Sequence, residues 1–218
     1  MDSPSPVSGR NIDAVTVLNW AAENGHIDIV KSLLAIGVDV NARDGAGRGN
    51  TALLCAVWSV SFPIVRLLIK KGADVNLGNS IWTPLMWAAW MMSQTWSRGP
   101  SKKDVLAILK LLLAKGAKVN VRGRAGQTAL FIAASVGDVA TLRALIRAGA
   151  NIHTRTKNGN GALMGAVQNH NSPTIEFLLK RGVNVNAKNK EGKTALAFAE
   201  ECEADEIVQL LVQHGARK

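Results

Sequence analysis

The sequence predicts an all-α solenoid, in which short helix–turn–helix units stack side by side. Three observations favour this fold class: two short phrases recur along the 218 residues, an apolar pattern of helical period follows each phrase, and a glycine ends each pattern. The composition agrees, because 47% hydrophobic and 19% charged residues are typical of a chain that builds a core and not of a disordered one.

Two phrases carry the repeat. The first joins glycine, alanine or valine, a polar residue, a hydrophobic residue and usually asparagine, and its copies are GVDVN (37–41), GADVN (72–76), GAKVN (116–120), GANIH (149–153) and GVNVN (182–186). The second has the form TALxxA, and its copies are TVLNWA (16–21), TALLCA (51–56), TPLMWA (83–88), TALFIA (128–133), GALMGA (161–166) and TALAFA (194–199). These copies start 35, 32, 45, 33 and 33 residues apart, so the period is 33 and the long gap contains a twelve-residue insertion.

Each second phrase is expected to open a helix, with its threonine as N-cap and Pro84 in a first turn. A second helix follows, and its apolar residues recur at i, i+1, i+4 and i+5, as in Ile29, Val30, Leu33 and Leu34. A left-handed glycine then ends the second helix, at Gly37, Gly72, Gly116, Gly149, Gly182 and Gly215. Such a unit cannot bury its apolar face alone, so it stacks on its neighbours.

This pattern resembles the ankyrin repeat in its period and in the family's T-P-L-H-x-A signature. Thr83 and Pro84 match that signature most closely, although Met86 replaces its histidine, and GHIDIV (25–30) is similar to the start of the family's second helix. The resemblance implies an ankyrin-repeat solenoid with β-turn or hairpin fingers. It divides the chain into a flexible tail and one domain, 11–218, with six repeats; the expected ranges are 1–10 for the tail and about 11–43, 44–77, 78–121, 122–154, 155–187 and 188–218 for the repeats.

The two ends differ from the internal copies, as expected of caps that face solvent on one side. The first copy lacks the usual finger sequence, and the last copy replaces its second alanine with Glu200 and continues into an acidic run. We therefore expect both ends to be capping repeats and the chain to be complete.

Several classes of protein are not supported. The N-terminus is polar and no stretch approaches 18 uninterrupted apolar residues, so neither a signal peptide nor a membrane span is expected. Cys55 and Cys202 fall in expected helices as free thiols, which favours a reducing, cytoplasmic or nucleocytoplasmic compartment. The four histidines belong to different repeats, and no catalytic, nucleotide-binding or metal-binding motif occurs. We expect no enzyme activity, no catalytic residue, no metal and no cofactor.

The formal net charge of +10 is concentrated in one part of the chain. Residues 97–199 hold seventeen basic and four acidic residues, whereas residues 1–96 are neutral and the last helix pair is acidic. Three consecutive fingers are basic through Arg122, Arg124, Arg155, Lys157, Lys188, Lys190 and Lys193. These tips are either a surface for an acidic partner or a solvated edge, and because they protrude, their charges need not serve stability.

All six tryptophans lie between residues 20 and 96, in the first three repeats. Two pairs share equivalent repeat positions, and positions i and i+3 face one side of a helix. By analogy with the family, five project towards one concave groove: Trp20, Trp58, Trp82, Trp87 and Trp90. The alternative is that the rings, above all Trp96, pack on one another and on the insertion. The insertion, residues 91–103, is either an arm over this groove or an idle loop.

Two functions fit these features. In the first, which we favour, the protein is a monomeric adaptor or scaffold that binds a partner protein with an apolar and an acidic segment. In the second, tryptophans stack on bases and basic residues contact phosphates of a nucleic acid or nucleotide. Against the second, the tryptophans and the basic tips lie in different halves of the chain. Recognition of a methylated lysine by a Trp cage would need an acidic wall, for which only Glu23 and Asp44 are candidates.

Overall fold

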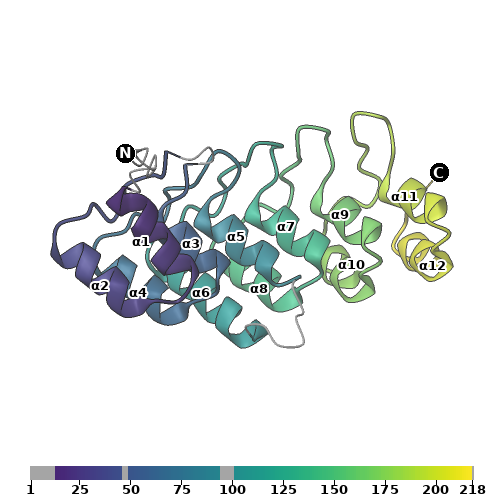
Figure 1. Cartoon of the computed structure of the whole chain (residues 1–218). Helices are drawn as coiled ribbons and strands as arrows, with labels where there is room; N and C mark the ends of the chain where they lie inside the picture. The colour runs from purple at the N-terminus through teal and green to yellow at the C-terminus, as the bar shows by residue number, and fades with distance from the viewer. Residues whose placement is uncertain (1–12, 46–48, 94–100, 218) are drawn as a thin grey trace, which may run out of the picture.

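The computed structural model describes residues 13–45, 49–93 and 101–217, and these residues form twelve helices and no strand. The helices follow one another in pairs that stack into an elongated solenoid, with finger loops along one side (Figure 1). Their bounds are α1 (Ala14–Glu23), α2 (Ile27–Ala35), α3 (Ala52–Trp58), α4 (Phe62–Lys70), α5 (Pro84–Met91), α6 (Lys102–Ala114), α7 (Ala129–Val136), α8 (Val139–Arg147), α9 (Ala162–Gln168), α10 (Ser172–Leu179), α11 (Ala195–Glu201) and α12 (Asp205–Gln213). The predicted all-α repeat solenoid is confirmed. None of the described helices is long and apolar enough to cross a membrane.

The helices form two layers. The first helices of the pairs, α1, α3, α5, α7, α9 and α11, pack on one another in chain order, and each also packs on the second helix of its own pair (Figure 1). Leucines such as Leu53, Leu85 and Leu142 are fully buried in the core. The paired alanines of the second phrase, for example Ala88 and Ala89, are buried as well, and their small side chains let neighbouring first helices approach closely.

Most first helices begin where the sequence predicts. In four of them the opening threonine hydroxyl accepts a hydrogen bond from the backbone N–H three residues later, at Thr51, Thr83, Thr128 and Thr194. The prediction is wrong for the first copy, because α1 begins at Ala14 and its cap is Asp13. The Asp13 carboxylate accepts a hydrogen bond from the backbone N–H of Thr16, at 2.6 Å. Aspartate caps a helix as well as threonine does, so the helix starts earlier than the phrase.

The predicted glycine stops are confirmed. All six glycines have a left-handed backbone, with φ between 75° at Gly182 and 91° at Gly72. Glycine adopts this conformation without the steric penalty that a Cβ brings. Each second helix therefore ends two or three residues before its glycine, and the chain turns at the glycine, after the first five of these helices towards the next finger.

Asparagines at the finger bases tie each repeat to the next. In Asn76, Nδ2 donates to the carbonyl of Gly116 at 3.3 Å, and Oδ1 accepts from the backbone N–H of Lys118 at 2.7 Å. The same pair of bonds to the following repeat is made by Asn41, Asn120 and Asn186. In the fourth copy this position is His153, and the described residues show no bond from its side chain to the next repeat.

Two local features go beyond the sequence pattern. The apolar face of α2 is only partly buried, because this helix lies at the end of the stack, and 41% of Ile29 stays exposed. The predicted insertion, 91–103, is partly helical, since Ser101 caps α6 and Lys102 and Lys103 belong to its first turn. Residues 94–100 of the insertion, with Trp96, lie outside the described residues.

Candidate interaction site

Four tryptophans contact one another, and we call them the Trp cluster: Trp58, Trp82, Trp87 and Trp90. The ring of Trp87 has centroid distances of 4.7 Å to Trp58, 4.7 Å to Trp82 and 5.7 Å to Trp90. The rings of Trp58 and Trp90 are stacked, with centroids 5.7 Å apart and 18° between their planes. Such distances are typical of attractive aromatic pairs, so the cluster is one packed unit.

Neighbouring elements position these four rings. Trp87 and Trp90 lie three residues apart on α5, Trp58 is the last residue of α3, and Trp82 precedes the helix cap Thr83. The ring of Trp87 is only 9% exposed, whereas Trp58 is 41% exposed. The cluster therefore has a buried base and an exposed edge. Its rings pack on one another, which was one alternative from the sequence, and part of their surface faces solvent, as the other alternative required.

Trp20 lies apart from the Trp cluster. Its ring centroid is 5.0 Å from that of His26, and 52% of the residue is exposed. Within the described part of the chain, no ring contact joins Trp20 to the other tryptophans. The structure thus brings together four of the five tryptophans that were expected in one groove.

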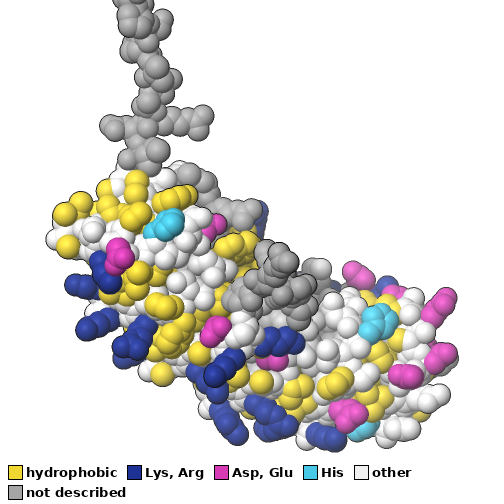
Figure 2. All heavy atoms as spheres, turned by 60° about the horizontal axis from the view of Figure 1, so that its bottom comes forward, with side chains coloured by type: hydrophobic (Ala, Val, Ile, Leu, Met, Phe, Trp, Pro, Cys, Tyr) yellow, Lys and Arg dark blue, Asp and Glu magenta, His cyan; other side chains and the backbone are white. Residues whose placement is uncertain are grey.

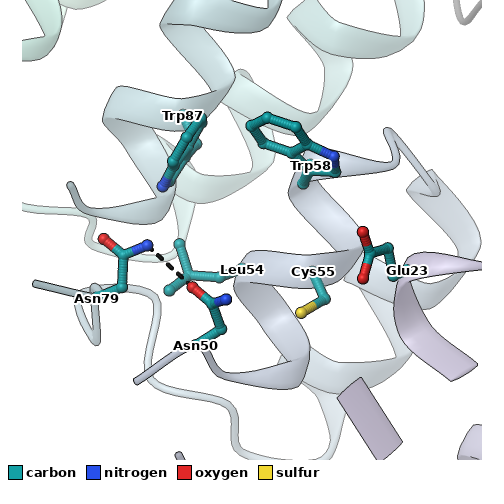
Figure 3. A pocket seen from close by; sticks show the side chains of 7 residues that line it. All are labelled: Glu23, Asn50, Leu54, Cys55, Trp58, Asn79 and Trp87. Atoms are coloured by element: carbon teal, nitrogen blue, oxygen red, sulfur yellow. Dashed lines mark hydrogen bonds between the residues drawn. The ribbon is translucent and has the colours of Figure 1, made fainter. Parts of the chain in front are cut away.

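A cavity of about 180 Å³ opens beside the Trp cluster, and we call it the Trp cavity (Figure 3). Its lining residues are, from the first helices, Glu23, Leu54, Cys55, Trp58 and Trp87, and, from the bases of two fingers, Asn50 and Asn79. Figure 3 shows these side chains around an open centre, with Glu23 and Asn79 on opposite sides. The cavity therefore lies between helices and fingers and draws on the first three helix pairs.

Sequence reasoning missed Cys55 and named Glu23 only as a candidate acidic wall for a Trp cage, although a comparison of repeat positions places both beside the tryptophans. Counted from the opening threonine, Cys55 holds the position of Trp87, and Glu23 holds that of Trp58. These positions are three residues apart, so both face one side of each first helix. A position-by-position alignment of the repeats would have added Glu23 and Cys55 to the predicted surface.

The charges near the floor of the Trp cavity are negative: Glu23 lines the cavity, and Asp44 acts on Cys55 from outside its lining. Burial raises the pKa of the Cys55 thiol to about 12, and the negative charges of Glu23 and Asp44 act in the same direction. Asp44 is held in its finger by a hydrogen bond from the backbone N–H of Asn50, at 3.0 Å. No lysine or arginine of the described chain lines the cavity. The cavity is therefore suited to a neutral or positively charged group and not to an anion.

The predicted basic tips divide into two groups. The side chains of Arg122 and Arg155 are held by hydrogen bonds within the protein, because each guanidinium donates to a backbone carbonyl of the following finger, at 2.5 Å. These two tip residues therefore link neighbouring fingers, a structural role that their protruding position did not require. Of the other five tip residues, Lys193 pairs with Glu201. The remaining four are exposed and have no ion-pair partner among the described residues: Arg124, Lys157, Lys188 and Lys190.

A second, wider hollow of about 510 Å³ lies between the fingers, and we call it the finger hollow. Its lining includes Trp82 together with four basic residues and no acidic one; the basic residues are Arg43, Arg122, Arg124 and Lys157. The Trp82 ring lies against Gly123, where an added Cβ would be 2.9 Å from Cδ1 of the indole. The sequence placed the tryptophans and the basic tips in different halves of the chain, but the structure brings Trp82 and three of these tips to one hollow. Sequence reasoning did not single out Arg43.

The acidic residues gather at the C-terminal end, as the sequence indicated. Figure 2 shows Asp and Glu side chains crowded at that end and Lys and Arg side chains along the lower edge of the view, from the N-terminal end to the middle of the molecule. Five exposed carboxylates form this acidic end: Glu200, Glu201, Glu203, Asp205 and Glu206. One of them neutralises a finger charge, because Glu201 pairs with Lys193 at 2.7 Å.

The site offers binding groups and little catalytic chemistry. In the ranges that the structure describes, no group of three or more His, Cys, Asp and Glu residues could hold a metal ion. The raised pKa of Cys55 keeps its side chain a thiol even well above neutral pH, and a thiol is a poor nucleophile compared with a thiolate. Cys202 is free and exposed.

The comparison with family models defines the class of protein. The model described as "Ankyrin repeats (3 copies)" matches residues 18–96, 101–189 and 137–218. These matches cover most of the chain, and the chain therefore belongs to the ankyrin repeat family, as the resemblance implied. Ankyrin repeats are, in general, domains that bind other proteins.

Curated relatives match only parts of the chain. It is 33% identical over 82 residues to the NF-kappa-B inhibitor cactus of Drosophila yakuba, which is 38% of this chain and 17% of cactus. It is 41% identical over 70 residues to the putative ankyrin repeat protein YahD of Escherichia coli K12, 32% of this chain and 33% of YahD. It is 44% identical over 59 residues to ankyrin repeat domain-containing protein 29 of Danio rerio, 27% of this chain and 19% of that protein. The chain thus spans a third or less of these relatives.

Proposed function

We propose that the protein is a non-catalytic adaptor or scaffold that binds a partner protein on the surface formed by its first helices and fingers. One observation carries the proposal: the Trp cluster presents the exposed edge of Trp58 beside an open cavity. Tryptophan and arginine dominate interaction hot spots, where truncation of one side chain costs about 2 kcal/mol or more. Four packed rings with a partly open surface therefore favour a binding site over a purely structural core.

The exposed basic tips would act on the same partner at longer range. Arg124, Lys157, Lys188 and Lys190 lie on consecutive fingers beyond the Trp cluster and are free of ion pairs within the described ranges. Exposed charges of one sign steer an oppositely charged partner and raise its association rate. The preferred partner accordingly has an apolar segment for the cluster and an acidic segment for the tips, and it meets a monomer in the cytoplasm or nucleus.

The test is capture of a partner from extracts of the source organism by matched tryptophan variants. The double variant Trp58→Ala/Trp90→Ala removes the accessible part of the cluster and spares Trp87, whose loss would damage the core. Trp20→Ala is the control, because this ring is exposed but lies outside the cluster. We expect the double variant to lose a protein that the wild type and the control retain. Equal capture by all three would refute the proposal.

A second candidate function is binding of a nucleic acid or nucleotide in the finger hollow. The observation that favours it is the meeting of Trp82 with Arg43, Arg124 and Lys157, since an indole can stack on a base while cations contact phosphates. Fluorescence anisotropy with a labelled single-stranded oligonucleotide at several salt concentrations would test this function. It predicts binding that weakens with salt and with Arg124→Ala/Lys157→Ala. Absence of binding at low salt would eliminate it.

A further inference from the structure

We infer that the Trp cavity binds an N-methylated ammonium group, carried by a lysine side chain of the partner protein. The inference rests on the proposed function and specifies the chemistry of one contact within it. Three features of the cavity support it: two tryptophan rings that meet at an angle, negative charge without an ion-pair partner, and few free hydrogen-bond acceptors on its finger side.

The two rings provide aromatic surface on adjacent sides. Trp58 and Trp87 have centroids 4.7 Å apart and planes inclined by 78°, so they form a corner (Figure 3). A cation within about 6 Å of an indole centroid is attracted by the negative face of the ring. The floor is apolar, from Leu54 and Cys55, and about 180 Å³ has room for several water molecules or one side-chain head group.

The charge around the cavity selects a cation. Glu23 is exposed, and its carboxylate has no ion-pair partner in the part of the chain that the structure describes. Asp44, outside the cavity lining, adds a second negative charge that acts on Cys55, and no described lysine or arginine lines the cavity. An anion would be repelled there, and a neutral group would partly desolvate Glu23 without compensation. A positively charged group would gain both the Coulomb and the aromatic attraction.

The hydrogen bonds of the finger side argue for a methylated ammonium. Oδ1 of Asn79 accepts from the backbone N–H groups of Ile81 and Trp82, both at 2.9 Å. Oδ1 of Asn50 accepts from Nδ2 of Asn79, also at 2.9 Å. A primary ammonium brings three N–H donors, and the lining side chains leave it the Glu23 carboxylate and the one remaining lone pair of Asn50 Oδ1. A methylated ammonium has fewer donors or none, and its methyl groups can contact the rings.

The two charged regions give the partner a direction. The Trp cavity at the first three helix pairs would hold its cationic side chain, and the free basic tips beyond would face its acidic segment. A partner bound in the reverse direction would place like charges together at both positions, which is unfavourable.

Titration of the isotope-labelled protein with small probes tests the inference without a partner. The probes are Nα-acetyl-Nε-trimethyllysine methylamide, its unmethylated counterpart, and a neutral analogue with carbon in place of the quaternary nitrogen. The indole N–H resonances report on each ring, and Trp20 is an internal control. We expect the trimethyl probe to shift Trp58 and Trp87 but not Trp20, and to bind about tenfold more tightly than the neutral analogue. The unmethylated probe should bind more weakly than the trimethyl probe.

Two variants with a matched control complete the test. Glu23→Gln should weaken binding of the trimethyl probe about two- to fivefold and leave the neutral analogue unaffected. Glu206→Gln, an exposed carboxylate at the acidic end, should change neither. Trp58→Leu should abolish the preference for the cation, and because Trp58 is 41% exposed, this variant should stay folded in a thermal melt.

Three results would overturn the inference: no indole shift with the trimethyl probe, equal binding of the neutral analogue, or tighter binding of the unmethylated probe. Each can be told apart from failure of the proposed function. If the probes fail while Trp58→Ala/Trp90→Ala still loses the captured partner, the cluster binds a partner through another kind of group. If the probes bind and capture is unaffected, the adaptor proposal fails and the cation site stands alone.

Discussion

At the scale of single residues, the stack depends on one residue type used at each finger base. Asn41, Asn76, Asn120 and Asn186 each bridge to the next repeat through both ends of the side-chain amide. A carboxamide suits this position because it donates and accepts at once. His153 replaces asparagine at the finger base between the fourth and fifth helix pairs. We therefore expect the contact between these two pairs to be weaker than the contacts that an asparagine bridges.

His153→Asn should therefore stabilise the protein. The new amide can donate to the carbonyl of Gly182 and accept from the backbone N–H of Asn184, by analogy with the other finger bases. Each hydrogen bond contributes about 0.5–1.5 kcal/mol, so the free energy of unfolding should rise by roughly 1–2 kcal/mol in urea titrations. The reverse change, Asn120→His, should lower it by a similar amount. An unchanged midpoint for both variants would contradict this role of the amide.

The two thiols should differ in reactivity. Cys55 is buried with a pKa raised to about 12, whereas Cys202 is exposed. A thiol-specific chromogenic reagent at pH 8 should modify only Cys202 in the folded chain and both cysteines after unfolding. Rapid modification of Cys55 in the folded state would disagree with its burial.

The stability of the protein should also depend on the Cys55 thiol at high pH. Because the folded pKa of Cys55 lies above its ordinary value of 9.0, its contribution to stability is full below pH 9 and is lost as the pH rises towards 12. In Cys55→Ala, the free energy of unfolding should fall less between pH 9 and 12 than in the wild type, as measured by urea titrations at several pH values.

At the scale of helices and fingers, the sequence predicted local features well and contacts between repeats poorly. Threonine caps, glycine stops and apolar faces depend on neighbours within a few residues, and these were largely correct. Placing Glu23 beside Trp58, or Trp82 beside Lys157, requires the offset between stacked repeats, which no local pattern contains. The structural role of Arg155 was missed for the same reason, since its acceptor is the carbonyl of Lys188, 33 residues away.

Gly123 illustrates such a contact between fingers. Its backbone φ is not in the left-handed region, so the effect of a substitution there is steric: an added Cβ would lie 2.9 Å from the Trp82 ring and 3.0 Å from the carbonyl of Ile81. Gly123→Ala should displace Trp82, change its indole resonance and lower the free energy of unfolding by about 1–3 kcal/mol. Gly45→Ala is the control, because open space surrounds its Cβ position. Equal behaviour of the two variants would show that the contact is unimportant.

At the scale of the whole molecule, binding groups of two kinds are concentrated in different parts of one solenoid and meet at the finger hollow, where Trp82 lies with Arg124 and Lys157. The aromatic groups and the Trp cavity belong to the first three helix pairs, and the free basic tips belong to the later fingers. A rigid stack keeps the two regions at a fixed separation, because each repeat is packed on its neighbours. The aromatic region would set the lifetime of a complex, and the basic region its rate of formation.

Charge reversal at the tips tests that division. Lys188→Glu/Lys190→Glu should slow association with an acidic partner about tenfold at low salt and leave the dissociation rate nearly unchanged. The difference from wild type should shrink as salt increases, because exposed charges are screened. Stopped-flow or biosensor kinetics would measure both rates. A change confined to dissociation would show that the tips act by close contact and not by steering.

The central claim is that the Trp cluster is the binding surface, and the dissociation constant of the captured partner tests it most directly. Trp58→Ala/Trp90→Ala should weaken that constant about 30-fold or more, the effect of losing 2 kcal/mol or more at a hot spot, whereas Trp20→Ala should leave it within about twofold. Thermal melts of the three proteins would establish that all are folded. An unchanged constant for the double variant, in a folded protein, would contradict the claim.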